Sequence, residues 1–268
     1  MARNKFQSNN VRKKRRQRFV FKLGLSLLVL VLLVFALTKL LSISSLQVRN
    51  FTVLGAVSIN EDDIKKTAVD VSGGKYFTLL PKTNFLIFPK KALEKKILND
   101  FPRTQGVEVN LTSLQDAEIN IKERKPFAIW CDSENPEKCY FMDSKGYVYA
   151  EGINATAGVY FIYRGGFEGS PMRQNYLPEF FVKLNLLIDE IKKMGVTPLS
   201  VEPINENEFE ISAEGGKIIF PLEENTSRII SNLDSILQDQ SLFAIRDGRL
   251  QVESIDLRYG NKAVIKRR

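Results

Sequence analysis

A long apolar run at residues 19–43, FVFKLGLSLLVLVLLVFALTKLLSI, constrains this chain more than any other feature. As an α-helix this run would be about 37 Å long, enough to cross the ~30 Å hydrocarbon core of a bilayer. Lys22 and Lys39 flank its uncharged centre, and their long side chains can reach the lipid headgroups. We therefore predict one transmembrane helix over residues 19–43.

A cleaved signal peptide is the alternative interpretation of this run. Signal peptides have a shorter apolar region, of about 7–15 residues, followed by an Ala-x-Ala-like cleavage site. The Ser-Ile-Ser sequence at residues 42–44 is a poor version of such a site. The length of the run favours a membrane anchor over a cleaved signal.

The basic residues are concentrated before this run. Residues 1–22 hold nine Lys and Arg residues and no acidic one, and we assign residues 1–18 to a basic cytoplasmic tail. Subtracting these nine from the 39 basic residues leaves 30, against 31 acidic residues. The positive-inside rule predicts a single-pass protein of the cytoplasmic membrane, with its C-terminal part outside. The near-neutral remainder argues against nucleic-acid binding, which needs a broad basic surface.

Two cysteines, Cys131 and Cys139, fall in the part predicted to be exported. An oxidising compartment permits a disulfide, and the polar loop DSENPEK between them suits the turn of a hairpin. Two free buried thiols are the alternative, because the sequence does not show the Cα separation that the bond requires. A structural zinc site is excluded, since two cysteines and no histidine cannot fill four positions.

Residues 46–124 contain short elements in the order strand, helix, helix, strand, strand. The first strand ends at Gly55, and Ser58 and Glu61 stand at capping-box spacing before a helix that Gly73 is expected to end. One sheet with both helices on one face is the simplest way to bury their apolar stripes.

The second helix and the last two strands of this segment follow a loop rich in aromatic residues. Pro89 is expected at the first position of the helix, which stops before Pro102. Alternating apolar residues then predict strands at residues 106–111 and 117–124.

Residues 125–268 are predicted to form a mainly antiparallel β domain with two helices. The helices are expected at residues 178–194 and 226–237, from their apolar residues at helical spacing. Gly215-Gly216 separates two β-prone runs and predicts a hairpin turn. The overall fold class is therefore α+β.

Catalytic chemistry has little support in this sequence. The chain has no histidine, which excludes a Ser-His-Asp triad, a Cys-His nucleophile and a His-Glu-x-x-His zinc site. Paired carboxylates could serve a membrane-anchored cell-wall hydrolase, and the candidate pairs are Asp62 with Asp63 and Glu223 with Glu224. Surface solvation explains nearly all of the 31 acidic residues. We predict no catalytic residue, cofactor, metal or small-molecule substrate.

The final strand is predicted at residues 262–266, after a Gly260-Asn261 turn. We expect this strand to lie at the edge of its sheet. Proteins commonly protect such an edge with charge, and Lys262, Lys266 and the two arginines that follow would suit that purpose. The functional alternative is that the edge accepts a strand from a partner.

Several features in chain order carry a family resemblance. They are the basic tail, the membrane span, the strand-helix-helix-strand-strand module ending in IKERKP (residues 121–126), the DSKGYVY turn (143–149) and IDLRY (255–259). Together they resemble the FtsQ/DivIB cell-division proteins. The resemblance implies a POTRA domain at residues 46–124, a family β domain at 125–268, and location at the division site.

The resemblance also implies a function without catalysis. A protein of this family would act as a division scaffold that binds small membrane partners of the FtsB/DivIC and FtsL types. In that family a partner strand adds to the last strand of the β domain, and Tyr259 occupies the matching DLRY position. The expected partner-binding residues are therefore Tyr259, Lys262, Ala263, Val264, Ile265 and Lys266. The alternatives are the cell-wall hydrolase above and a POTRA-type export factor.

Overall fold

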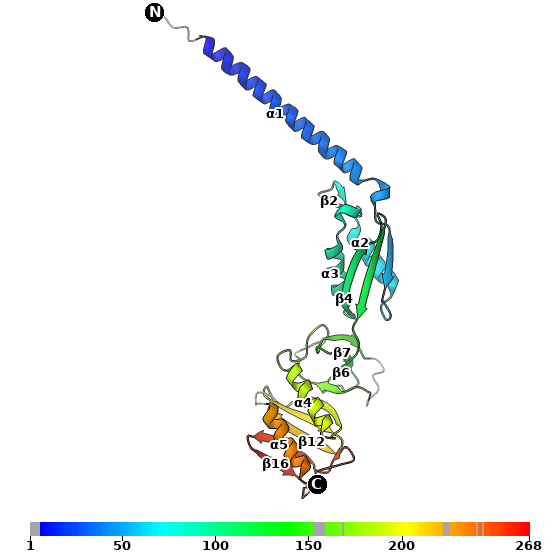
Figure 1. Cartoon of the computed structure of the whole chain (residues 1–268), viewed down its shortest axis with the longest axis vertical. Helices are drawn as coiled ribbons and strands as arrows, with labels where there is room; N and C mark the ends of the chain where they lie inside the picture. The colour runs from blue at the N-terminus through cyan, green and yellow to red at the C-terminus, as the bar shows by residue number, and fades with distance from the viewer. Residues whose placement is uncertain (1–5, 153–158, 168, 222–225, 240, 243) are drawn as a thin grey trace, which may run out of the picture. The chain divides into compact units, whose positions relative to one another are not determined.

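The structure is a computed structural model that describes residues 6–152, 159–167, 169–221, 226–239, 241–242 and 244–268 (Figure 1). The chain divides into two compact units, Met1–Glu123 and Arg124–Arg268, which we call unit 1 and unit 2. The expected α+β class is confirmed, with five α-helices among the described residues.

Helix α1 (Phe6–Leu41) contains the apolar run. It begins inside the expected basic tail and ends two residues before the end of the predicted span. Its stretch Lys13–Leu41 is long and apolar enough to cross a membrane, and none of its most apolar 18 residues is buried inside the protein. Length and composition alone do not separate an anchor from a signal sequence, which would pass the same test.

The rest of unit 1 is a three-stranded sheet with two α-helices, two short 3-10 helices and a small two-stranded hairpin. Its elements are η1 (Ser44–Leu46), β1 (Asn50–Leu54), α2 (Glu61–Ser72), β2 (Lys75–Tyr76), β3 (Leu80–Pro81), η2 (Phe85–Ile87), α3 (Lys90–Asp100), β4 (Thr104–Leu111) and β5 (Asp116–Glu123). The sheet order is β1-β5-β4, with β1 parallel and β4 antiparallel to β5. Apolar residues of α2 and α3, such as Ile64 and Leu93, form one core with Ile119 of β5.

Three local predictions in unit 1 shift by one or two residues. Asn60, not Ser58, caps α2, because the Asn60 side chain accepts a hydrogen bond from the Asp62 N–H. The left-handed residue after α2 is Gly74 rather than Gly73. Pro89 precedes α3 as its N-cap residue instead of occupying the first helical position.

Unit 2 is built on a nine-stranded sheet. Its elements are β6 (Ala128–Cys131), β7 (Cys139–Met142), β8 (Val148–Glu151), β9 (Ile162–Arg164), α4 (Phe181–Lys193), β10 (Pro198–Pro203), β11 (Glu208–Ala213), β12 (Gly216–Pro221), α5 (Thr226–Gln238), β13 (Ile245–Arg246), β14 (Arg249–Leu250), β15 (Ser254–Tyr259) and β16 (Lys262–Lys266). The sheet order is β16-β15-β12-β11-β10-β9-β6-β7-β8, and β13 and β14 form a separate hairpin.

The sheet of unit 2 is mainly antiparallel, as predicted, since five of the eight neighbouring pairs among its described strands are antiparallel, but it also has parallel pairs that were not predicted. Three of its neighbouring pairs are parallel, namely β15 with β12, β10 with β9, and β9 with β6. Two of these pairs flank a helix in sequence, as β9-α4-β10 and β12-α5-β15. A parallel pair needs such a crossover connection. The helices predicted at residues 178–194 and 226–237 correspond to α4 and α5, but their role as crossovers was not predicted, nor were β9 and β10.

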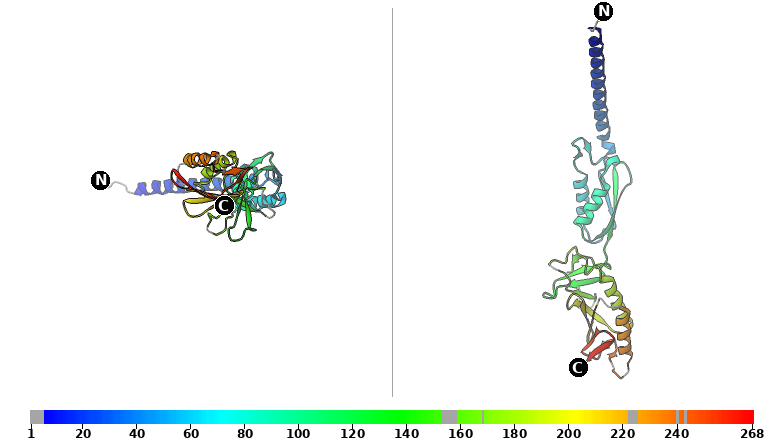
Figure 2. Two further views of the ribbon diagram at one scale, coloured as in Figure 1. Left: turned by 90° about the horizontal axis from the view of Figure 1, so that it is seen from below. Right: turned by 90° about the vertical axis from the view of Figure 1, so that its left-hand side faces the viewer.

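One face of the unit 2 sheet is covered by helices. Both crossovers move in the same direction along the sheet order, and right-handed connections then place α4 and α5 on the same face. Figure 2 shows the two helices together along one side of the strands. Their apolar residues, such as Leu184, Ile191 and Leu233, pack with Phe209, Phe220 and other inward residues of the strands. We call the opposite face of strands β10–β12, β15 and β16 the outer face.

The turn between β11 and β12 also differs from the prediction. Ala213 pairs with Gly216, so the two turn residues are Glu214 and Gly215, and Gly216 begins β12. Gly215 has a φ of +84°, and a Cβ there would lie 2.3 Å from the carbonyl oxygen of Leu250. The close approach of the Leu250 backbone therefore requires glycine at this position.

Candidate functional site

Strand β16 lies at one edge of the nine-stranded sheet. It pairs with β15 on one side, and within the described parts of the chain no strand pairs with its other side. The bounds predicted from the sequence, residues 262–266, are confirmed. An edge strand directs the N–H and C=O groups of alternate residues away from its sheet, where they are available to another strand.

The side chains of β16 separate into two sets. Ala263 and Ile265 are half-buried and pack against the core of unit 2. Lys262, Val264 and Lys266 are exposed, and Val264 keeps 54% of its surface accessible. Its inner side chains thus hold the strand on the sheet, and its outer side chains are free to contact another molecule.

A bulge in β15 determines where Tyr259 points. Asp256 pairs with Val264 and Tyr259 pairs with Lys262, so three steps along β15 match two steps along β16. Because paired residues share a face of the sheet, the extra residue brings Tyr259 to the outer face with Lys262. Without the bulge, simple alternation from Ile255 would turn Tyr259 toward the helices. The Tyr259 side chain is 56% exposed.

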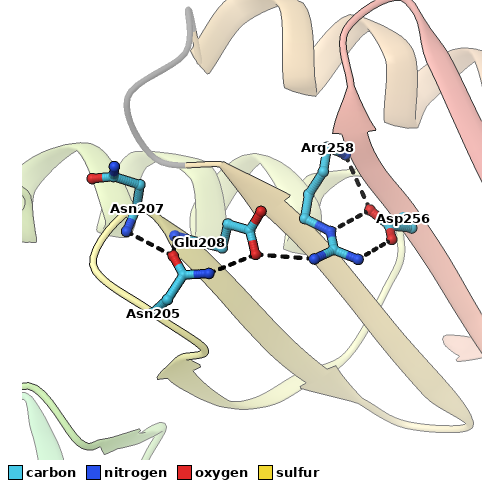
Figure 3. A network of polar contacts seen from close by, with 5 residues as sticks. All are labelled: Asn205, Asn207, Glu208, Asp256 and Arg258. Carbon is cyan, nitrogen blue, oxygen red and sulfur yellow. Dashed lines mark hydrogen bonds and ion pairs between the residues drawn. The ribbon is translucent and has the colours of Figure 1, made fainter.

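Arg258, the residue before this tyrosine, belongs to an ion-pair network with Asp256 and Glu208 (Figure 3). The Arg258 guanidinium donates to both carboxylate oxygens of Asp256, at 2.9 and 2.6 Å, and to Glu208 of β11 at 2.9 Å. Asn205 donates to the same Glu208 oxygen at 2.7 Å. The guanidinium carbon lies 5.9 Å from the centre of the Tyr259 ring.

The network also stabilises the bulge itself. The carboxylate of Asp256 accepts a hydrogen bond from the backbone N–H of Arg258 at 3.1 Å. The hydrogen bonds from the Arg258 side chain outweigh the effect of burial and lower the pKa of Asp256. The same partners raise the pKa of Arg258 above its ordinary value. This charge network therefore fixes the backbone and side chains on which Tyr259 depends.

Sequence reasoning did not identify Arg258, Asp256 or Glu208 as part of the site. Arg258 and Asp256 lie within the IDLRY motif, but Glu208 is 50 residues earlier and two strands away. The IDLRY motif marked the position of Tyr259, whereas the β15 bulge and the contact with Glu208 had no signal in the sequence.

The basic residues at the end of the chain are partly engaged within unit 2. Lys266 forms an ion pair with Glu253 at 2.6 Å, and the Arg268 guanidinium donates to the Gly215 carbonyl. Both contacts are exposed, and exposed pairs of this kind contribute about 0–1 kcal/mol. They can therefore be exchanged for contacts with a partner.

Cys131 and Cys139 form a disulfide between β6 and β7. The two residues are directly opposed in the antiparallel pair, at the base of the loop that contains the DSENPEK sequence. Five strands separate β6 from β16 in the sheet. The fold therefore does not bring the disulfide together with the residues predicted to bind a partner.

The carboxylates considered for a hydrolase are not assembled into a described site. Asp62 and Asp63 are exposed in the first turn of α2, and Glu223 and Glu224 lie outside the described residues. A surface cavity of about 500 Å³ in unit 2 is lined by one carboxylate, Glu214, which forms an ion pair with Arg249 at 3.0 Å. The described residues contain no group of three or more His, Cys, Asp or Glu side chains that could hold a metal ion.

Comparison with known proteins adds no family assignment. No protein-family model matches the chain, and no curated protein matches it significantly.

Proposed function

We propose that this protein is a membrane-anchored scaffold of the FtsQ/DivIB type, without enzymatic activity, that binds a partner by strand addition to β16. In this proposal α1 crosses the cytoplasmic membrane once with the N-terminus inside, and residues 46–268 lie outside at the division site. The partners are small membrane proteins of the FtsB/DivIC and FtsL types.

The observation that carries the proposal is the open edge of β16. Its backbone groups, together with exposed Val264 and Tyr259, offer both parts of a strand-addition site. Main-chain hydrogen bonds would supply affinity, and side chains at alternate positions would supply specificity. The Arg258 network supports the proposal because it holds the edge hairpin in one geometry before a partner arrives.

The arrangement of unit 1 also supports the family proposal. We propose that residues 46–124 are a POTRA domain and residues 125–268 the family β domain. The strand-helix-helix-strand-strand order, with β5 between β1 and β4 and both helices packed into one core, agrees with the module implied by the sequence resemblance.

Crosslinking in native membranes tests this proposal. A photoreactive amino acid at Lys262, an exposed position on β16, should capture a small single-span membrane protein that mass spectrometry can identify. Proline variants then test the backbone. Of the neighbouring residues Ala263 and Val264, one directs its N–H away from β15, so Ala263→Pro or Val264→Pro should remove a ladder bond to the partner.

The proline at the outward-facing position should reduce capture about tenfold or more, the equivalent of losing ~1.4 kcal/mol. Val264→Thr is the matched control, since threonine keeps the backbone N–H and the β-branched shape, and it should bind nearly as well as wild type. Tyr259→Ala should have an intermediate effect. If both proline variants capture the partner as well as wild type while β15 and β16 stay protected from hydrogen exchange, strand addition at this edge is wrong.

A further inference from the structure

The hairpin formed by β2 and β3 carries a phenylalanine at its tip. Lys75 pairs with Pro81 and Tyr76 with Leu80, and the Leu79 N–H donates to the Tyr76 carbonyl at 3.0 Å. The turn thus places Phe77 outside the sheet. Phe77 is 90% exposed. Such exposure is unusual for a large aromatic side chain that does not pack against the rest of the protein.

The backbone at this tip is conformationally unfavourable. Phe77 has a φ of +47° and Thr78 a φ of +62°. Turns that require two positive φ values strongly prefer Asn-Gly or similar pairs, and a bulky or β-branched residue in this region is an outlier. The chain therefore accepts both strain and an exposed ring at one residue, a combination that is typical of functional surfaces.

Two more exposed apolar residues lie in the same segment as Phe77. Leu79 is exposed beside it, and Leu86, in the middle of η2, is 70% exposed. We call Phe77, Leu79 and Leu86 the juxtamembrane patch, since all three lie in the segment that contacts the end of α1. These residues are separate from β16, which belongs to unit 2.

Buried Asn84 ties this segment to the last residue of α1. Its side-chain amide donates to the Leu41 carbonyl at 2.8 Å, and its side-chain oxygen accepts from the Leu86 N–H at 2.9 Å. Gln47 donates to the same Leu41 carbonyl at 2.9 Å. β3 also contacts α1 directly. The patch is therefore fixed next to the C-terminal end of the apolar helix.

The segment that holds the patch is basic in sequence, although Lys91 forms an ion pair with Glu94 at 2.8 Å. Residues 71–93 contain no Asp or Glu and four lysines, at positions 75, 82, 90 and 91. Lysine side chains attract anionic lipid headgroups, each contributing a modest amount near a membrane surface. Aromatic residues favour the interface between headgroups and hydrocarbon. A protein surface that is apolar at its centre and basic around it has the composition of a membrane-surface contact.

We infer that the juxtamembrane patch inserts into the interface of the bilayer leaflet that surrounds the C-terminal end of α1. This inference rests on α1 spanning a membrane, as proposed above. The patch would hold unit 1 against the lipid surface through Phe77, Leu79 and Leu86, with the lysines contacting anionic headgroups. A protein partner could also cover an apolar patch, but its attachment to the end of α1 and its basic surroundings favour lipid.

Depth-dependent fluorescence quenching tests this inference in the full-length chain. The protein would be reconstituted into vesicles of phosphatidylethanolamine and phosphatidylglycerol containing lipids that are spin-labelled near the headgroup or deeper in the acyl chain. An environment-sensitive dye would be attached to one introduced cysteine at a time, at Leu30, Val57 or Thr78. The two native cysteines are joined in a disulfide and do not compete for the label.

Each position has a defined purpose. Leu30 lies near the middle of the apolar run of α1 and reports whether that run is in the bilayer. Thr78 is next to Phe77 at the tip and leaves the patch intact. Val57 is the matched control, because it is also an exposed apolar residue of unit 1, at 88%, but it lies beside Glu123 at the end of β5 rather than beside α1.

We expect lipids spin-labelled deep in the acyl chain to quench the Leu30 dye strongly. Lipids labelled near the headgroup should quench the Thr78 dye strongly, and neither should quench a dye at Val57. Phe77→Asp in the Thr78→Cys background should abolish the quenching at the tip and restore the emission seen in water. Replacing phosphatidylglycerol with phosphatidylcholine should weaken the quenching of the Thr78 dye.

Three results would overturn the inference, and they differ in meaning. Quenching at Leu30 without quenching at Thr78 would leave the anchor in place and show that the patch faces water or a protein. Absence of quenching at Leu30 would refute the anchor and the inference together. Quenching at Thr78 that persists in the Phe77→Asp variant would show that the phenylalanine does not hold the tip in the interface.

Discussion

Glu123, the last residue of β5, allows a prediction whose size can be worked from the structure. One oxygen of its carboxylate accepts hydrogen bonds from the backbone N–H groups of Val57, Ser58 and Ile59, at 2.7, 2.8 and 3.0 Å. These residues connect β1 to α2, so the carboxylate fastens that connection to the end of β5. Glu123→Ala removes the acceptor from all three donors.

The expected loss is smaller than three full hydrogen bonds. A hydrogen bond to a charged group contributes about 1.5–3 kcal/mol, but water can replace the carboxylate at exposed N–H groups. Val57 and Ser58 are exposed and only Ile59 is buried. We therefore expect Glu123→Ala to destabilise this connection by about 2 kcal/mol, near the value of one such bond. Glu123→Gln keeps an acceptor oxygen without the charge and should lose about half as much.

Hydrogen exchange of the 57–59 amides is the assay. A loss of ~2 kcal/mol corresponds to protection that falls roughly 30-fold when exchange follows local opening. Glu118→Ala is the matched control on the same strand, because Glu118 accepts one side-chain hydrogen bond, from Asn120 at 2.8 Å. If protection in Glu123→Ala stays within about twofold of wild type, the carboxylate does not fasten the connection and the reasoning is wrong.

The pH dependence of this connection's stability tests the same prediction independently. Partial burial opposes ionisation of Glu123, but hydrogen bonds from the three N–H groups outweigh it and lower its pKa below the ordinary 4.5. A lowered pKa means that the stabilisation is fully present above pH 4.5 and is lost as the pH falls through the folded-state value. Wild type should lose protection of this segment in that range, and Glu123→Gln should not.

The remaining predictions concern three other positions. Cys131 and Cys139 should resist thiol labelling in denaturant until a reductant is added, and replacing both with serine should lower the free energy of unfolding by about 2.5 kcal/mol, whereas immediate labelling would contradict the disulfide. Asp256→Asn should weaken the β15–β16 hairpin by about 1–2 kcal/mol at neutral pH. Wild type, whose Asp256 pKa is lowered by Arg258, should lose this difference only as the pH falls below about 3.8, and equal hydrogen exchange in both proteins at neutral pH would disprove the role. Gly55→Ala should destabilise unit 1 by at least about 2 kcal/mol, because its φ is +79° and a Cβ would lie 2.2 Å from a β5 carbonyl oxygen; an unchanged melting temperature would refute this.

Features that depend on neighbouring residues in sequence were predictable. The apolar run specifies a helix too hydrophobic for a small core, and α1 contains it. The apolar residues that predict α4 by their helical spacing include Phe181, Leu184, Ile188 and Ile191, and all four are buried, since this spacing places them on one face. The bounds of β16 followed from alternation and from Gly260-Asn261.

Features that depend on which distant segments meet were decided only by the tertiary structure. The parallel pairing of β12 with β15 follows from the path of α5 over the sheet, and no residue in either strand encodes it locally. The β15 bulge moves Tyr259 to the outer face only because β16 pairs with β15 in a shifted register. Arg258 reaches Glu208 because β12 alone separates their strands. Alternation within one strand specifies two faces, but pairing between strands determines which face each residue occupies.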